Sequence, residues 1–573
     1  IEAGRNTTPP NPAVEAVALN NLAEMANNSG NFQDAEKYLL QLIPIMETGL
    51  GKNDAKIGIL KGNLGAVYKA MKRYSQAEKC YLDSIDIFKI ETDKNEANIA
   101  NAYGHLAAIY EAMDQYGKAL ELYDKSREIY TKLDGADSTA AKRLSVSQAG
   151  VLQTMGRFTE AETLLKKVID TYTNTEAKPD LQLSSALNSL AKLYLKMKKL
   201  DLAETNMKRA LDINLQVFGQ DHKETALVMN DLALIYQNEA KYDLAEKLLL
   251  QSMEIYRKKS GENSLQVSAV YNNLGTLYQE QGKYEDAEKC LKKSLEIGLK
   301  NADSQSLLIA GKLNNLAEFY RVMGRYTEAE PLYLKAVSIY EKVLGRDHPD
   351  YANILNNLAS FYHEAGKLRQ ANEFYEKSLS IIENNPASQP FDKAKILNNY
   401  AQFNLARGKF KEAFEGFEKA LVITESVLGK EHPDLASPLN NLAVAYFNFG
   451  RSDKAIRLMT RAMELAEKNF GSDNIAVATY ASNLAIFLIN KKQYSDAAKL
   501  LEKSLSIRLK ALGKEHTVIA VNYSALGGLY LEQKKYKEAE DYFRKAIQID
   551  EKIFGPDSFN LSNGLGNLAL ALA

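Results

Sequence analysis

Seven asparagine side chains recur at a constant spacing of 42 residues, and they are the best candidates in this sequence for binding a ligand: Asn188, Asn230, Asn272, Asn314, Asn356, Asn398 and Asn440. A primary amide offers two hydrogen-bond donors and an acceptor oxygen. A row of amides could therefore hold an extended peptide by its backbone without demanding one side-chain sequence. Most copies carry a second asparagine beside the first, so the row could equally bond a neighbouring helix and set the register of a stack. The sequence leaves both interpretations open.

Histidine is the next residue type that could carry chemistry. Four of the six histidines share one position of the same 42-residue period: His222, His348, His432 and His516. A zinc or catalytic site would need partner ligands nearby, but equivalent positions in successive repeats bring no cysteine or second histidine with them. The pattern therefore predicts a capping or linker-packing role and no metal site or cofactor. His363 projects from a predicted groove-facing helix and could touch a ligand, whereas His105 replaces an asparagine of the pattern.

The motifs of catalysis are missing from this sequence. It contains no CxxC, HExxH or GxSxG motif and no phosphate-binding GxxxxGK followed by Ser or Thr. The stretch from Gly564 to Ala569 matches the dinucleotide fingerprint GxGxxG/A, but that fingerprint needs a preceding strand, and here it falls in a predicted helix. Cys80 and Cys290 occupy equivalent positions on distant repeats, which makes an intramolecular disulfide geometrically implausible. An enzyme is accordingly the least favoured functional class.

Small residues define the elements that must position these side chains. One ladder is alanine in every copy: Ala35, Ala77, Ala119, Ala161, Ala203, Ala245, Ala287, Ala329, Ala371, Ala413, Ala455, Ala497 and Ala539. A second ladder, from Ala23 to Ala569, is always Ala or Gly, and aromatic residues such as Tyr320 and Tyr326 lie between the two. Apolar spacings of three and four on both sides of Gly324 indicate two amphipathic helices joined by a tight turn.

The order Leu316, Ala317, Tyr320, Gly324, Tyr326 and Ala329 resembles the tetratricopeptide repeat. The 42-residue length and the linkers LGRDHPDYANILNN and LGKEHPDLASPLNN resemble the kinesin-light-chain type of that repeat. The resemblance implies an all-α fold, a right-handed α-solenoid of 13 complete helical hairpins plus part of a fourteenth, in which each repeat contacts only its neighbours. We expect an N-terminal polar segment over residues 1–15 and one continuous solenoid over residues 16–573.

Composition narrows the choice of partner. Lys plus Arg (72) nearly equals Asp plus Glu (73), and no run of like charges suggests binding to nucleic acid. No segment approaches the roughly 20 apolar residues that cross a bilayer, so no membrane insertion is predicted. The expected partner is a protein or an extended peptide held in a concave groove. No Lys or Arg accompanies the asparagine row as in carboxylate-clamp tetratricopeptide proteins, so an acidic C-terminal tail is not the predicted ligand.

Three functions remain compatible with this sequence. The first is a non-enzymatic scaffold for protein interaction. The second is a subunit that assembles head to tail into a filament through apolar residues at its two ends: Val17, Leu19, Leu22, Leu568, Leu570 and Leu572. The third is the sensor portion of a larger signalling ATPase. The resemblance implies a cytoplasmic location, whereas an export signal removed before Ile1 would imply a processed, exported protein.

Overall fold

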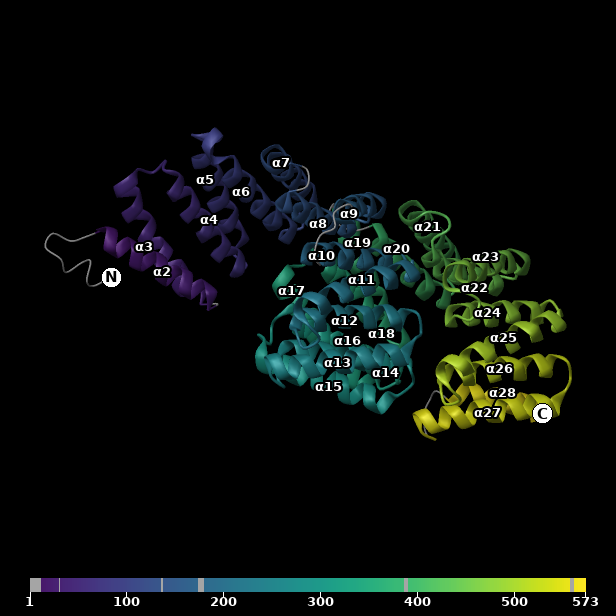
Figure 1. Cartoon of the computed structure of the whole chain (residues 1–573). Coiled ribbons are helices and arrows are strands. Elements are labelled where there is room, and N and C mark those ends of the chain that lie inside the picture. Colours follow the sequence, from purple (N-terminus) through teal and green to yellow (C-terminus); the bar gives the residue numbers. More distant parts are fainter. Residues whose placement is uncertain are drawn as a thin grey trace. The chain divides into compact units, whose positions relative to one another are not determined.

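The computed structural model describes residues 12–29, 31–135, 138–173, 180–385, 390–556 and 561–572, and every regular element within these ranges is a helix (Figure 1). The chain forms two compact units, Ile1–Ser189 and Leu190–Ala573, whose boundary falls inside α10. Most of the expected polar segment over residues 1–15 lies outside the described residues, and α2 begins at Pro12.

The helices of the first unit are α2 (Pro12–Asn28), α3 (Phe32–Leu50), α4 (Ala55–Ala70), α5 (Tyr74–Lys89), α6 (Thr92–Ala112), α7 (Tyr116–Asp134), α8 (Thr139–Thr154), α9 (Phe158–Thr173) and the start of α10 (Leu181–Lys196). The second unit continues with α11 (Leu200–Phe218), α12 (Lys223–Asn238), α13 (Tyr242–Ser260), α14 (Leu265–Glu280), α15 (Tyr284–Asn301), α16 (Leu307–Val322), α17 (Tyr326–Leu344), α18 (Pro349–Glu364), α19 (Leu368–Asn384), α20 (Pro390–Ala406), α21 (Phe410–Leu428), the short 3-10 helix η1 (Pro433–Leu435), α22 (Ala436–Asn448), α23 (Ser452–Phe470), α24 (Ile475–Asn490), α25 (Tyr494–Leu512), α26 (Thr517–Glu532), α27 (Tyr536–Phe554) and α28 (Ser562–Leu572).

Consecutive helices pair as hairpins, from α2 with α3 to α26 with α27, and α28 is the first helix of a further copy. The all-α solenoid predicted from the period is thereby confirmed. In each described turn between the two helices of a hairpin, one residue has a positive φ angle, for example 69° at Gly324 and 57° at Ala240. Glycine is favoured there because the left-handed conformation costs residues with a Cβ atom more.

The two small-residue ladders lie where the helices of a hairpin approach each other. All thirteen alanines of the first ladder are fully buried. Glycine replaces alanine in the second ladder where the opposite side chain leaves no room. A Cβ atom on Gly275 would lie 2.6 Å from Leu291, and one on Gly527 would lie 2.6 Å from Phe543. Ala569 of α28 is exposed, unlike the earlier members of its ladder.

Neighbouring hairpins in the second unit are joined by a repeated polar clasp. Glu288 of α15 accepts hydrogen bonds from the Tyr320 hydroxyl at 3.1 Å and from the Arg325 guanidinium at 2.7 Å. The same guanidinium lies 4.4 Å from the centre of the Tyr320 ring. The clasp recurs one repeat earlier around Glu246 and one repeat later around Glu330. It ties each first helix to the hairpin before it, which complements the apolar contacts between repeats.

Repeats far apart in the sequence also contact each other in the second unit. The imidazole of His516 lies against Gly282 and 6.4 Å, centre to centre, from the Tyr284 ring, more than 230 residues earlier in the chain. The expectation that each repeat contacts only its neighbours is therefore wrong in this unit. The small rotation between successive hairpins accumulates until later repeats meet earlier ones.

Candidate functional site

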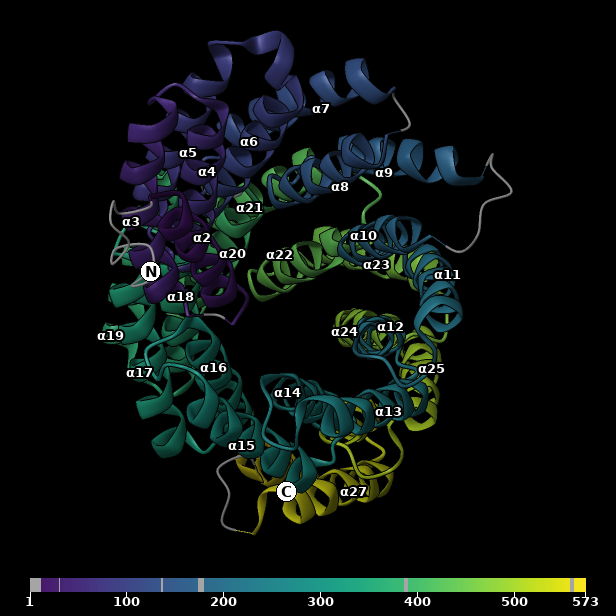
Figure 2. The same cartoon turned by 60° about the vertical axis from the view of Figure 1, so that its left-hand side comes forward.

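The even-numbered helices of the second unit lie on the inner side of its coil, and the odd-numbered helices lie on the outer side (Figure 2). The asparagine row from Asn230 to Asn440 belongs to the inner helices α12, α14, α16, α18, α20 and α22. From Asn272 onward the next residue is also asparagine, and the same position of the following repeat, after Ser482, is Asn483. We call this set the second row: Asn273, Asn315, Asn357, Asn399, Asn441 and Asn483.

The two rows are joined by hydrogen bonds between successive repeats. Each second-row amide nitrogen Nδ2 donates to the Oδ1 atom of the first-row asparagine in the preceding repeat. The six bonds are Asn273 to Asn230 at 3.1 Å, Asn315 to Asn272 at 3.0 Å, Asn357 to Asn314 at 3.3 Å, Asn399 to Asn356 at 3.3 Å, Asn441 to Asn398 at 3.1 Å and Asn483 to Asn440 at 2.7 Å. The oxygen atoms of the first row are therefore bonded to the following repeat, which is the contact that the register interpretation expects, and both interpretations of the row stay predictions.

Some of the amide groups in the two rows make no further hydrogen bond, whereas Nδ2 of Asn440 donates to Oδ1 of Asn441 at 2.9 Å. Among the described residues, Nδ2 of Asn272 and Asn314 donates no hydrogen bond, and Oδ1 of Asn315 and Asn357 accepts none. These side chains are half-buried. Asn356 differs from its neighbours, because its side chain is 1% exposed and its Nδ2 atom is buried without a partner. Asn188, in α10, is half-buried. The row is thus an uneven surface, with Asn356 withdrawn into the core.

Apolar side chains accompany the amides on the inner helices. Leu227 and Leu234 of α12 are 44% and 46% exposed. They lie three residues before and four residues after Asn230, so all three share one face of the helix. Ile486 of α24, three residues after Asn483, is also exposed. The inner face can therefore offer both hydrogen bonds and apolar contact.

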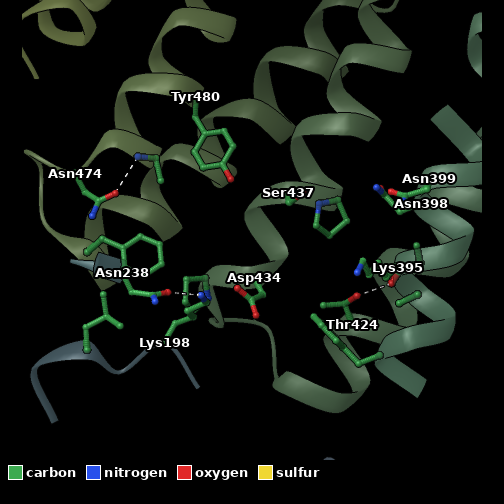
Figure 3. A pocket seen from close by; sticks show the side chains of 18 residues that line it. Lys198, Asn238, Lys395, Asn398, Asn399, Thr424, Asp434, Ser437, Asn474 and Tyr480 are labelled. Carbon is green, nitrogen blue, oxygen red and sulfur yellow. Dashed lines mark hydrogen bonds between the residues drawn. The ribbon is translucent and has the colours of Figure 1, made fainter. Parts of the chain in front are cut away.

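A cavity of about 620 Å³ opens at this face (Figure 3). One wall comes from the turn after α10, the start of α11 and the end of α12, with Lys198, Leu200 and Asn238. The other wall comes from α20 to α24, with the side chains of Phe391, Asn398, Asn399, Asp434, Ser437 and Tyr480. Lys198 donates a hydrogen bond to Asn238 at 3.1 Å. Sequence reasoning missed this cavity, because its walls lie on repeats far apart in the chain.

Burial controls the ionisation of the acidic groups in this cavity. It raises the pKa of the Asp434 carboxyl, although His432 and Lys198 favour the charged form. Burial, with a smaller contribution from Asp434, raises the pKa of Tyr480 to about 12. The phenol is therefore a neutral hydrogen-bonding group at physiological pH. The exposed Lys395 ammonium adds a positive charge at the opening.

The four histidines that occupy the same position of the repeat cap helices, as predicted. In each, Nδ1 accepts a hydrogen bond from the backbone N–H two residues later: 3.2 Å at His222, 3.0 Å at His348, 3.2 Å at His432 and 3.2 Å at His516. The bond satisfies one of the otherwise unpaired donors at a helix start. No group of three or more potential metal ligands occurs in the described part of the chain.

The other residues that the sequence singled out make packing contacts or lie within a helix. His363 packs edge-on against Phe403 at 5.2 Å, and burial lowers the pKa of its imidazole. His105 stacks on Tyr81 at 5.5 Å. Cys80 and Cys290 are free thiols, and burial raises the pKa of each to about 11. The GxGxxG match from Gly564 lies within α28, a helix, so it lacks the strand that a dinucleotide site requires.

The proposed self-association residues fall into two groups. Val17 is 63% exposed, Leu570 is 65% exposed and Leu572 is 59% exposed. Leu19 is fully buried, so it belongs to the core of its hairpin and is not available to a partner. Leu22 is half-buried, and Leu568 packs against the cluster of Ala539, Phe543 and Ala571. Self-association through the exposed members stays a prediction.

Stacked hairpins with an amide-lined inner face define a helical-repeat protein of the solenoid class. A family model described as "Tetratricopeptide repeat" matches residues 14–90, 98–174, 182–258, 224–300, 308–384, 392–468, 475–552 and 523–573. The chain therefore belongs to the tetratricopeptide repeat family, a fold that generally serves protein interaction and typically lacks catalytic activity. None of the described helices is long and apolar enough to cross a membrane.

Two similar solved structures are kinesin-light-chain-like repeat proteins. BtubC (BKLC) from P. vanneervenii is 24% identical, with 40% of this chain and 90% of that chain covered and a TM-score of 0.34. A variant of a Podosopora anserina protein assigned as a kinesin light chain, with nearly identical TPR-like repeats, is 25% identical, with 37% of this chain and 98% of that chain covered and a TM-score of 0.31. No curated protein matches the chain.

Proposed function

We propose that this chain is a non-enzymatic scaffold that binds an extended segment of a partner protein along the inner face of its second unit. The observation that carries the proposal is the double row of asparagines. We call each hydrogen-bonded pair of asparagines a rung. In the Asn272–Asn315 and Asn314–Asn357 rungs, one donor and one acceptor join two repeats, and the Nδ2 group of the first-row residue and the Oδ1 atom of the second-row residue make no other hydrogen bond among the described residues. An extended peptide presents backbone N–H and C=O groups that match both.

The inter-repeat bonds support binding as well as register. An amide whose oxygen is already held in place loses little rotational freedom when its nitrogen engages a ligand. Exposed leucines beside the row, such as Leu227 and Leu234, provide apolar contact for alternate side chains of the bound segment. The cavity between Lys198 and Tyr480 is large enough to take a bulky side chain of that segment.

The test separates the two roles of the first row. Asn272→Asp with Asn314→Asp keeps an oxygen acceptor for Asn315 and Asn357 but removes the unused donors. Asn272→Ala with Asn314→Ala removes both. The probe is a linear peptide enriched from a random display library on the wild-type chain, with its affinity measured by fluorescence anisotropy.

We expect the aspartate pair to lower the affinity for that peptide about tenfold, for two lost hydrogen bonds of ordinary strength, and to leave the melting temperature nearly unchanged. The alanine pair should lower both. Substituting the exposed Lys289, on the outer helix α15, controls for a nonspecific change of surface. If the library yields no specific binder, or if the aspartate pair binds as the wild type does, the proposal is wrong.

A further inference from the structure

Three helix starts in the second unit lie beside hairpin turns that precede them by more than five repeats. The turn residues are Lys198, Ala240 and Gly282, which have positive φ angles of 54°, 57° and 74°. The corresponding helix starts are capped by His432, Asn474 and His516. Each cap follows its turn residue by the same number of positions, so the juxtaposition has the period of the coil. Asn238 and Asn474 line the same cavity from the two sides.

His516 lies directly against the turn at Gly282. Its Nδ1 atom is fixed by the bond from the Val518 N–H group. A Cβ atom on Gly282 would lie 2.8 Å from its Cδ2 atom, a separation that real Cβ atoms do not adopt. The imidazole also faces the backbone of Glu280, and its charged neighbour is Arg508. A side chain at residue 282 would therefore force the His516 ring to move, in addition to the strain from the positive φ angle.

His432 occupies the equivalent place two repeats earlier. Its Nδ1 atom is fixed by the Asp434 N–H group, and its side chain is buried. The buried Nε2 atom faces the backbone of Met197. Asp434 on its own element and Lys198 and Lys199 on the opposite turn surround it.

Two positions in the same unit separate the cap from the contact with an earlier turn: His222 caps without such a contact, and Asn474 caps without a histidine ring. His222 caps α12 in the same way, but its ring stacks on Phe218 of the adjoining helix, 4.2 Å between centres and 8° between planes. Asn474 caps α24 through its Oδ1 atom, which accepts from the Ala476 N–H group at 2.9 Å. Asparagine can therefore replace histidine as the cap at this position of the repeat.

We propose that His432 and His516 are positioning residues that hold successive turns of the second unit together as a seam. The cap bond fixes one edge of each imidazole, and the other edge lies against the backbone of the earlier turn. At His432 the seam joins the two walls of the cavity described above, because Lys198 and Asp434 line that cavity from its two sides, and closure there sets its width. This proposal does not depend on the peptide-binding function.

The first test replaces each ring while keeping its cap. His432→Asn and His516→Asn should leave the helix starts capped, as at Asn474, and remove the contact with the earlier turn. We expect hydrogen exchange of the backbone amides at residues 197–199 and 280–283 to rise about fivefold, the factor for one interaction of ordinary strength. His222→Asn in the full-length chain is the matched control and should leave both segments unchanged.

The second test is a double-mutant cycle between Gly282 and His516. Gly282→Ala adds a Cβ atom that collides with the ring, whereas Gly408→Ala, at the same φ of 74° and with no atom within 4 Å of its added Cβ, carries only the backbone strain. Exchange near residue 282 should rise more than exchange near residue 408. Adding His516→Asn to Gly282→Ala should bring no further rise, because the contact is already lost. The proposal is wrong if the two glycine substitutions raise the exchange rates equally. It is also wrong if the effects of Gly282→Ala and His516→Asn on the exchange rate multiply fully.

Discussion

A buried lysine gives the sharpest prediction about stability. Lys312 of α16 is 6% exposed, at a position of the repeat where the neighbouring copies carry Val270 and Ile354. Its ammonium donates to the Ser294 hydroxyl at 2.7 Å and to the Ser268 carbonyl at 3.4 Å, and no carboxylate among the described residues forms an ion pair with it. We expect Lys312→Met, which conserves most of the volume, to stabilise the second unit.

The magnitude follows from the ionisation of the ammonium. Burial lowers the pKa of Lys312 from 10.5 to about 8. A shift of one unit corresponds to 1.36 kcal/mol, so the folded state carries a penalty of about 3 kcal/mol at pH 7. Ser268 and Ser294 also bond each other, so removing the ammonium leaves neither of them without a partner. The substitution should therefore recover most of this free energy.

The pH dependence of stability gives the sign of this contribution. Because the folded-state pKa is the lower one, the unfolded chain binds more protons between pH 8 and pH 10.5, and the stability of the wild type rises with pH across that window. The penalty is complete below pH 8 and disappears near pH 10.5. The advantage of Lys312→Met should therefore be largest at pH 7 and shrink steadily above pH 8.

Urea unfolding followed by circular dichroism, on both proteins at several values between pH 7 and pH 10.5, measures this difference. Other groups that titrate in the range are common to both proteins and cancel. Lys289→Met, on an exposed site of α15 with a side chain 72% exposed, is the control and should change stability little at any pH. A Lys312→Met chain that is less stable than the wild type at pH 7, or an advantage that is the same at both ends of the range, would refute the reasoning.

Two further predictions concern packing and association. Ala287→Leu overfills a fully buried contact and should lower the free energy of unfolding by about 1 to 3 kcal/mol. Because repeats interact mainly with their neighbours, hydrogen exchange should become faster in α14 to α17 and change little elsewhere. Exchange that accelerates equally throughout the chain would contradict this. Leu565, Leu570 and Leu572 of α28 are all more than half exposed, so we expect concentration-dependent association that Leu570→Glu with Leu572→Glu disperses, as measured by analytical ultracentrifugation. A sedimentation coefficient that does not change with concentration in the wild type would rule this out.

The hairpins, their turns and the histidine caps could be predicted from the sequence because each is a local feature that recurs. Burial of Ala35 and its equivalents depends on contact between two helices of one hairpin, and the position of His222 depends on the helix that it starts. Lys312 was also visible in principle, since it interrupts a column of apolar residues at a fixed register. These features require no knowledge of how many repeats complete one turn of the coil.

The seam and the cavity could not be predicted in this way. They depend on which repeats meet after one turn, and that is the sum of small rotations at every junction between hairpins. A small error at each junction moves the meeting point by a whole repeat. The presence of Gly282 beneath His516 has no local signal, because glycine at that position is already explained by the turn that it forms.

The asparagine rows show why register and binding need not be alternatives. Each bond between rows fixes one end of an amide in the first row and one end of an amide in the second, so the groups that remain are held at the spacing of the repeats themselves. Any change in the angle between two hairpins alters the spacing between neighbouring rungs. A segment bound across several rungs would stabilise one curvature of the coil over others, since it binds best where all rungs match its own repeat. The seam also favours one curvature, because it holds two successive turns of the coil in contact. Binding along the rows and closure of the seam should therefore favour each other.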